Sequence, residues 1–323
     1  MDEQVALTEN IVDARGWSRT RTWVETQVGD GPVEAVERLR GGWTSEMRRL
    51  RVAGADAPQW LVLRSFVKPF FVRHAEGLLT REANILRLLA ETDVPVAGFK
   101  AVDATAQHCD HPSLLMSLLP GTVRLDDEEA GLRTELLARQ LVDIHHVRVP
   151  GEARPRNYQA WTAPDRVNLP ATTERMDLWQ RAVDVIRRDP PDFQPCFLHR
   201  DFHPGNVLFE GHGAETRITG VVDWVETSWG PADLDVAHCS TALALLHGTG
   251  EAMRLAEQYV AAGGHLDSDP SAHLYWRLLD ALAFANVEKV ALPWQELGRT
   301  DLTSVLLTSR LEDYLHALFR RFG

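Results

Sequence analysis

Cysteine is scarce in this chain. Its 323 residues include three cysteines, Cys109, Cys196 and Cys239, which are odd in number and far apart in the sequence. This scarcity argues against a disulfide framework and against a zinc site built from clustered cysteines. We expect all three to be reduced thiols.

Long apolar runs are also missing. The chain opens MDEQVALTEN, which lacks the positive and then apolar order of a secretory signal. No apolar run approaches the roughly 20 residues that a membrane-spanning helix needs. With 44% apolar residues, the chain can still build a sizeable core. We therefore expect a globular, cytoplasmic protein that has no membrane partner.

Positive charge is in the minority, and the formal net charge is −12. Residues 1–120 carry 14 basic and 16 acidic side chains, whereas residues 121–323 carry 20 and 30. Such a surface argues against a nucleic-acid partner and would concentrate a cationic substrate, although the charge would also serve ordinary solubility. No protein partner is implied.

The stretch richest in reactive groups is CFLHRDFHPGNVLFEGHGAETRITGVVDWVETSWGPADLDVA, residues 196–237. It contains His199-Arg200-Asp201 and, after four intervening residues, Asn206, which is the H-R-D-x-x-x-x-N spacing of a kinase catalytic loop. The apolar runs around these residues predict short buried strands at 196–198, 207–209 and 218–222. The polar side chains, including Asp223, therefore fall at the ends of strands.

Phosphoryl transfer explains these residue types. Asp201 would orient an attacking hydroxyl and accept its proton, and Asn206 and Asp223 would supply oxygen ligands for Mg²⁺. The alternative is that all three are loop residues that satisfy turns, as Asp and Asn often do. We expect His199 to be a structural histidine that bonds loop carbonyls, because Asp201 already supplies a base.

The sequence resembles the aminoglycoside phosphotransferase-like small-molecule kinases, which are distant cousins of protein kinases. Their loop usually reads H-G-D-x-H-P-x-N, and HRDFHPGN is similar to it with Arg200 in place of the glycine. The following VVDWVETSWGPADLDVA is similar to the family's I-D-W and its G-x-x-x-x-D-L-A tail. The resemblance places Asp223 at the metal aspartate and Asp235 at a second aspartate that buttresses the loop.

The resemblance implies an α+β, protein-kinase-like bilobal fold. Residues 1–117 would form an N-lobe with a small antiparallel sheet and one helix, and residues 118–323 a mostly helical C-lobe with the catalytic loop and the acceptor site. ATP or GTP would donate the phosphate with Mg²⁺ in a site between the lobes. A protein kinase fits less well, because no A-P-E ending follows Asp223.

Three strands are predicted in the N-lobe after a short helix at 5–14: 33–39, 46–52 and 59–66. The turn between the first two contains Gly41 and Gly42. Glycine pairs are common in hairpin turns that bind nothing. In the family that this chain resembles, this turn, which here runs to Ser45, covers the nucleotide phosphates with main-chain N–H groups.

Arg64 lies in the third strand, where kinases usually have lysine. The family tolerates V-L-R at this place, and LVLR matches that version, so Arg64 would clamp nucleotide phosphates while staying charged. In the family that this chain resembles, a helix glutamate pairs with the strand cation, and the resemblance assigns this role to Glu82, on a helix predicted at 75–90. The alternative is that Glu82 is a solvated helix charge.

Strands predicted at 96–103 and 113–117 enclose His108-Cys109-Asp110-His111. We predict a turn there and no metal site, because four adjacent residues cannot all face one ion. The following LLMSLLPG resembles the family's hinge. The resemblance implies that Met116 packs behind the nucleotide base and that Ser117 and Leu118 offer it backbone groups.

Helical spacing dominates the rest of the chain, with helices predicted at 127–147, 173–188, 232–247, 251–262, 271–290 and 302–321. The irregular 148–171 segment could shape an acceptor pocket. Acidic residues of the last helices, Asp280 and Asp301 among them, could bind substrate amines, although most such side chains are simply solvated.

These observations favour Mg²⁺-dependent transfer of a nucleotide γ-phosphate to a hydroxyl of a small molecule. Our first hypothesis for the acceptor is an aminoglycoside or another antibiotic, which would make the protein a resistance kinase. A metabolic kinase of choline, homoserine or a sugar would use the same motifs. A nucleotide-binding pseudokinase is the third hypothesis: Arg64 in place of lysine favours it, and the intact Asp201, Asn206 and Asp223 oppose it.

Overall fold

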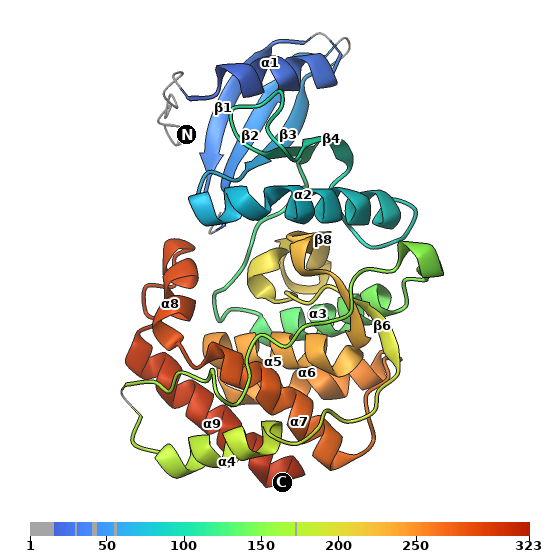
Figure 1. Ribbon diagram of the computed structural model, residues 1–323. Helices are drawn as coiled ribbons and strands as arrows, with labels where there is room; N and C mark the ends of the chain where they lie inside the picture. The colour runs from blue at the N-terminus through green and yellow to red at the C-terminus, as the bar shows by residue number, and fades with distance from the viewer. Residues whose placement is uncertain (1–15, 30, 41–43, 55–56, 172) are drawn as a thin grey trace. The chain divides into compact units, whose positions relative to one another are not determined.

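Figure 1 shows the computed structural model of the chain, which describes residues 16–29, 31–40, 44–54, 57–171 and 173–323. The predicted helix at 5–14, Gly41 and Gly42 lie outside the described residues. The chain divides into two compact units. Unit 1 consists of residues 1–88 and 97–118, and unit 2 consists of residues 89–96 and 119–323. The assignment of separate nucleotide and acceptor lobes stays a prediction.

Unit 1 is built on an antiparallel sheet with the strand order β1-β2-β3-β5-β4. Its strands are β1 (Val33–Leu39), β2 (Glu46–Val52), β3 (Gln59–Ser65), β4 (Phe99–Asp103) and β5 (Ser113–Ser117). β4 begins later than the predicted residue 96. The Gly98 N–H bonds the Ser117 side chain at 2.7 Å, while the Gly98 carbonyl accepts the Ser117 N–H, so the chain before Phe99 is held without a regular ladder.

Two helices accompany this sheet, α1 (Ser18–Gln27) and α2 (Pro69–Leu89). The sequence did not predict α1, whose exposed face is polar and whose buried face rests on Trp23 and Val24 in the core beneath β2 and β3. α2 begins at Pro69 and not at residue 75, because proline is well suited to the first turn of a helix, where its missing N–H has no partner to lose.

The 108–111 segment forms the predicted turn. The carboxylate of Asp103 accepts hydrogen bonds from the backbone N–H groups of residues 107–109, at 2.8–3.0 Å. Asp110 in turn accepts bonds from the backbone and the hydroxyl of Thr20 at 2.9 and 3.0 Å. The carboxylate of Asp103 therefore stabilises the turn, and that of Asp110 joins the turn to α1.

Unit 2 holds two short antiparallel strand pairs and a set of helices. The strands are β6 (Pro195–Leu198) with β9 (Ser228–Pro231), and β7 (Val207–Glu210) with β8 (Arg217–Val221). The α-helices are α3 (Ala130–His145), α4 (Met176–Ile186), α5 (Ala232–His247), α6 (Thr249–Ala261), α7 (Pro270–Ala281), α8 (Val287–Glu296) and α9 (Ser304–Phe322). The 3₁₀ turns are η2 (Gly151–Ala153), η3 (Pro204–Asn206), η4 (Gly213–Glu215), η5 (Trp224–Glu226) and η6 (Leu282–Phe284).

α5 is the central helix of unit 2. All its residues from Ala232 to Leu246 are buried, and α6, α7 and α9 pack against it. The single helix predicted at 271–290 is wrong, because the chain turns after Ala281 and the side chain of Asn286 caps a new helix, α8. Of the helices described, none is long and apolar enough to cross a membrane.

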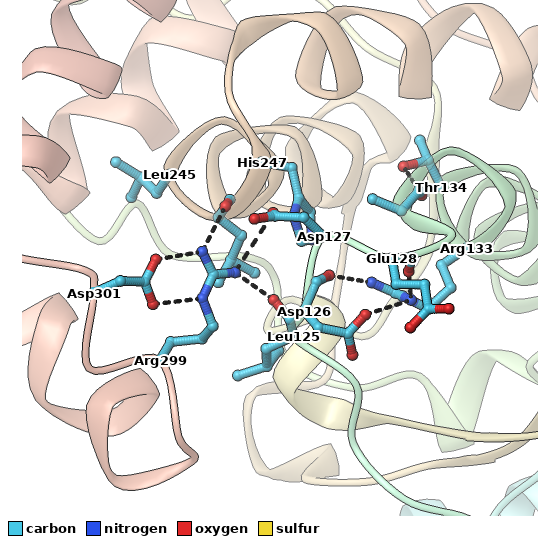
Figure 2. A network of polar contacts seen from close by, with 12 residues as sticks. Leu125, Asp126, Asp127, Glu128, Arg133, Thr134, Leu245, His247, Arg299 and Asp301 are labelled. Atoms are coloured by element: carbon cyan, nitrogen blue, oxygen red, sulfur yellow. Dashed lines mark hydrogen bonds and ion pairs between the residues drawn. The ribbon is translucent and has the colours of Figure 1, made fainter.

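The segment that leads into α3 is anchored to unit 2 by two buried arginines (Figure 2). Arg299, which follows α8, bonds both carboxylate oxygens of Asp301 at 2.8 Å and the carbonyl of Leu125. Arg133 of α3 bonds the carbonyl oxygens of Asp126 and Glu128. The bond to Leu125 satisfies a buried main-chain acceptor, and Asp301 is paired with Arg299 although its side chain is exposed.

Candidate active site

The catalytic-loop sequence runs from the end of β6 through η3 to the start of β7, and Asp235 of α5 bonds its backbone. The two carboxylate oxygens of Asp235 accept the backbone N–H groups of His199 and Arg200, each at 2.8 Å. Burial alone raises the pKa of Asp235, but the hydrogen bond from His145 and the neighbouring positive charges outweigh it and hold this pKa below its usual value. The buttressing role predicted for Asp235 is confirmed.

His199 is a structural histidine, as predicted. It is fully buried, and its Nε2 donates to the carbonyl of Val222 at 3.0 Å while its Nδ1 accepts the N–H of Asp201 at 3.2 Å. Burial lowers its pKa, so the ring is neutral and this single tautomer satisfies both contacts. The ring therefore joins the catalytic loop to the end of β8.

Asp201 presents a partly accessible carboxylate, with one oxygen in a hydrogen bond and the other beside two histidine rings. Its side chain is 28% exposed. One oxygen accepts the Asn206 amide at 3.1 Å, and the other lies 3.2 Å from Nε2 of His238 and 3.9 Å from Nε2 of His203. Partial burial alone would raise the pKa of Asp201, yet the contacts with His238 and His203 outweigh it and hold the pKa well below its usual range. Asp201 is thus ionised and oriented.

The candidate magnesium ligands lie at one end of the β7–β8 pair. Val207 pairs with Val221, and the N–H of Val222 donates to the carbonyl of Asn206 at 3.0 Å, so Asp223 follows directly beyond this bond. The Asn206 amide nitrogen is engaged with the carbonyl and the carboxylate of Asp201 at 2.9 and 3.1 Å. This orients the amide so that its oxygen is available, and an amide oxygen with a carboxylate fits Mg²⁺.

A second possible metal cluster is formed by Asp201, His203 and His238, whose nearest ligand atoms all lie within 4.8 Å of one another. The protons argue against a metal here. His203 Nδ1 accepts the Gly205 N–H at 3.0 Å and burial lowers its pKa to about 4, so the ring is neutral with the proton on Nε2. His238 faces carboxylates on both sides. The atoms nearest Asp201 are therefore N–H groups and not lone pairs.

Unit 1 contains the predicted ion pair between Arg64 and Glu82. Arg64 donates to both oxygens of Glu82 at 2.9 and 3.0 Å, and the two side chains are 5% and 3% exposed. A further bond of 3.2 Å joins Arg64 to the hydroxyl of Thr44, in the turn that precedes β2. This pair is confirmed, whereas the phosphate-binding role of Arg64 and of the buried Ser45 stays a prediction.

The predicted hinge residues are placed at the end of β5. Met116 is buried. The Ser117 N–H donates to the carbonyl of Gly98 at 2.8 Å, and the Leu118 N–H donates to the carbonyl of Trp60 at 3.1 Å. Both backbone N–H donors are thus engaged within unit 1, and the predicted contact of Ser117 and Leu118 with a nucleotide base stays a prediction.

A model of the phosphotransferase enzyme family matches residues 36–276, which is most of the chain. The chain belongs to the phosphotransferase enzyme family. One curated relative of this phosphotransferase-family chain is acyl-CoA dehydrogenase family member 10 of Mus musculus, with 26% identity over 226 residues. That match covers 64% of the chain and 20% of the mouse protein, so the chain spans about a fifth of this relative's length.

Solved structures share the fold at low identity. A thermostable mutant of aminoglycoside phosphotransferase APH(4)-Ia, in complex with ADP and hygromycin B, has a TM-score of 0.61, 15% identity and coverage of 93% of this chain and 99% of its own. APH(2")-IIia with GDP and kanamycin has a TM-score of 0.59, 17% identity and coverage of 93% and 97%. Macrolide 2'-phosphotransferase MphH from Brachybacterium faecium has a TM-score of 0.56, 17% identity and coverage of 89% and 97%. The predicted kinase-like α+β fold is confirmed.

Sequence reasoning missed part of the site. Asp280 of α7 is neither solvated nor exposed to a substrate amine, because it is almost fully buried against Arg200 and His238 of this phosphotransferase-family chain. The sequence carried one signal for it. Arg200 replaces a glycine in a loop between buried strands, and a buried guanidinium needs an acidic partner.

An open surface hollow of about 810 Å³ lies elsewhere in unit 2. Its lining comes from the start of α4, from Thr249 and from the end of α9, with Arg175, Asp313 and Arg320 among its charged residues. It contains no residue of the catalytic loop. We therefore do not assign it to the acceptor.

Proposed function

We propose that this protein transfers the γ-phosphate of ATP or GTP to a hydroxyl group of a small molecule in a Mg²⁺-dependent reaction. In unit 2, Asp201 orients the acceptor hydroxyl and takes its proton, and Asn206 and Asp223 hold the metal. In unit 1, Arg64, steadied by Glu82, holds nucleotide phosphates.

The observation that carries this proposal is the state of Asp201 in a chain of the phosphotransferase family. Its carboxylate is ionised and partly exposed, with one oxygen hydrogen-bonded to Asn206 and the other 3.2 Å from the ring of His238. Phosphoryl transfer involves a loose transition state that needs little covalent help, so an oriented acceptor of low basicity is sufficient. Asn206 and Asp223 would hold a magnesium ion, which would offset the negative charge of the phosphates.

For the acceptor we propose an aminoglycoside or a similar hydroxylated antibiotic, which would make the protein a resistance kinase. Two of the solved structures that share the fold contain hygromycin B or kanamycin. Residues 121–323 carry 30 acidic against 20 basic side chains, which suits a cationic ligand. The irregular 148–171 segment reaches the catalytic network through Trp161, whose ring lies edge-on to His238 at 4.7 Å.

The first experiment measures thermal shifts of the full chain with ATP and GTP, with and without Mg²⁺. Asp223→Ala should abolish the magnesium-dependent shift, because the neutral Asn206 cannot replace an anionic ligand. Asp184→Ala, which changes an exposed carboxylate of α4, is the matched control and should behave like wild type. Equal binding of magnesium nucleotide by wild type and Asp223→Ala would remove Asp223 from the metal site.

The second experiment is a turnover screen of hydroxylated amines, sugars and macrolides. Phosphorylation of an aminoglycoside, with an acceptor Michaelis constant that rises with ionic strength, supports a cationic acceptor held by carboxylates, since salt screens exposed charges beyond about 8 Å near physiological ionic strength. A macrolide should respond much less. Phosphorylation of a common metabolite alone would make the protein a metabolic kinase, and nucleotide binding without any turnover would make it a pseudokinase.

A further inference from the structure

His238 is an internal histidine placed between two carboxylates of unit 2. It extends from α5 and is 2% exposed. Its Nε2 lies 3.2 Å from Oδ1 of Asp201, and its Nδ1 lies 3.2 Å from Oδ1 of Asp280 on α7. One edge of the ring thus faces the catalytic loop and the other faces the core.

The inner end of this arrangement is fixed by Arg200. Its guanidinium lies 3.4 Å from the same oxygen of Asp280 and 4.4 Å from the centre of the Trp161 ring. Arg200 is almost fully buried and has a φ of 74°, in the left-handed region that favours glycine. The ion pair with Asp280 and the contact with the Trp161 ring offset the backbone strain at Arg200.

Other groups that face His238 come from three further places. His203 of the catalytic loop packs its ring 5.8 Å from the His238 ring, and its charge-bearing form is suppressed by burial. Trp161 and Phe284 close the remaining sides, with ring centres at 4.7 and 5.1 Å. The charged groups that decide the protonation of His238 are therefore Asp201 and Asp280, with Arg200 behind the latter.

Two carboxylates favour the imidazolium form. Burial alone lowers the pKa of His238, but the negative charges of Asp280 and Asp201 outweigh it and raise the pKa to about 9. Only the imidazolium carries N–H groups on both nitrogens. A neutral ring would turn a lone pair toward one of the two carboxylates.

We propose that His238, held in place by Asp280, is a positioning residue that fixes the orientation of the Asp201 carboxylate for phosphoryl transfer. This inference rests on the proposed function. Asn206 donates a hydrogen bond to one oxygen of Asp201, and the charged ring of His238 lies 3.2 Å from the other as an ion pair, so both oxygens of the carboxylate have a neighbour that attracts them. Misplacement of a catalytic group by about 1 Å can cost about a hundredfold in rate, so the second contact has a kinetic consequence. Because His238 is already protonated, it takes no proton from the reaction.

The test uses His238→Gln and Asp280→Asn in the full chain. His238→Gln should lower kcat by about 10- to 100-fold, and Asp280→Asn by less, while the dissociation constant of the magnesium nucleotide stays within about twofold. The matched control is His247→Gln, which changes a histidine of the same helix that bonds Asp127 at 2.6 Å, outside the catalytic loop. This control should keep the wild-type kcat.

The pH profile separates positioning from a purely structural role. Wild-type kcat should fall as pH rises through about 9, where His238 loses its proton, and this alkaline limb should be missing in His238→Gln. A loss of melting temperature with an unchanged profile would mean that His238 only supports the fold. Unchanged kcat in a folded His238→Gln would also overturn the proposal.

NMR titration of the His238 ring tests the geometry without turnover. Its pKa should be raised in the wild type, and Asp280→Asn and Asp201→Asn should each bring it closer to the ordinary value near 6.5. An ordinary pKa in the wild-type protein overturns the inference even when phosphoryl transfer is confirmed. Failure of the wild type to phosphorylate any acceptor overturns the proposed function instead, and a raised pKa would then describe only a structural ion network.

Discussion

The two units hold their buried charges in different ways. In unit 1, Arg64 and Glu82 form one ion pair in which both guanidinium-facing oxygens of the carboxylate are bonded. In unit 2, the charges of Asp201, His238, Asp280 and Arg200 alternate in sign along a chain of contacts from a partly exposed carboxylate to a buried guanidinium.

The difference indicates different tasks. A buried ion pair keeps one cation charged in one place, and each partner offsets the charge of the other. A chain of alternating charges instead leaves its last member, Asp201, ionised and directed at solvent, because each inner group is balanced by the next. The Arg64–Glu82 pair should therefore matter most for stability, and the four alternating charges of unit 2 should matter most for turnover.

The largest effect is expected at Asp201, the exposed member of the four alternating charges. Asp201→Asn should lower turnover by about two to four orders of magnitude, the usual scale for a positioned acid–base group, while nucleotide binding stays nearly intact. Steady-state kinetics and calorimetry with magnesium nucleotide measure the two quantities. Unchanged turnover together with lost nucleotide binding would mean that Asp201 binds nucleotide and does not act on the acceptor hydroxyl. The proposed difference in task between the two units would then be wrong.

Breaking the pair in unit 1 should act mainly on stability. Glu82→Gln removes the carboxylate from a buried guanidinium and should lower the free energy of unfolding by about 3 kcal/mol. Chemical denaturation measures this. The control is Asp184→Asn, which opens an exposed pair with Arg187 in which both side chains are more than half exposed, and it should change stability by less than about 1 kcal/mol. Similar losses in both variants would show that burial of the Arg64 pair is unimportant.

Arg200→Gly tests whether Arg200, the buried member of the four alternating charges, contributes to stability as the Arg64–Glu82 pair does. Glycine relieves about 1 kcal/mol of strain at a φ of 74°, but Asp280 loses a buried partner worth about 3 kcal/mol, so a net loss of about 2 kcal/mol is expected. Adding Asp280→Asn should recover part of it, because the neutral amide needs no cation. If the single variant is more stable than wild type, the ion pair does not offset the strain.

The last effect is no larger than that of Arg200→Gly and concerns Asp233, a buried carboxyl in the first turn of α5. Burial raises its pKa to about 6, with the charge of Arg277 opposing the shift in part. Because the folded pKa lies above the unfolded one, the stability that Asp233 contributes in its protonated form is present below about pH 4 and is lost as pH rises through 6. Asp233→Asn should therefore gain about 2 kcal/mol relative to wild type between pH 4.5 and pH 7.5. A pH-independent difference between the two unfolding curves would contradict the shift.

Much of the fold could be predicted because its signals are local. The strands β3 and β5 contain short apolar runs, β1 and β2 flank a turn that contains two glycines in the sequence, and α5 follows an apolar run that ends near Gly248. α1 could not be predicted in this way, since its stability depends on a few side chains that contact the sheet. Neither could the break between α7 and α8, where capping by Asn286 outweighs continuous helical spacing.

The spacing of residues within 196–206 and the position of Asp223 suggest the roles of Asp201, Asn206 and Asp223, which stay predictions, because these groups are close in the chain. The buttress Asp235 was implied by the family resemblance, and its bonds to the loop are confirmed. His238, Asp280 and Trp161 were decided only by the tertiary structure. Asp280 lies 80 residues from Arg200 and 42 from His238, and their contacts arise from the packing of α7 on α5. No periodicity encodes such distances. Their physical cause is that a buried arginine and a buried histidine must each find a carboxylate once helix packing has removed them from water.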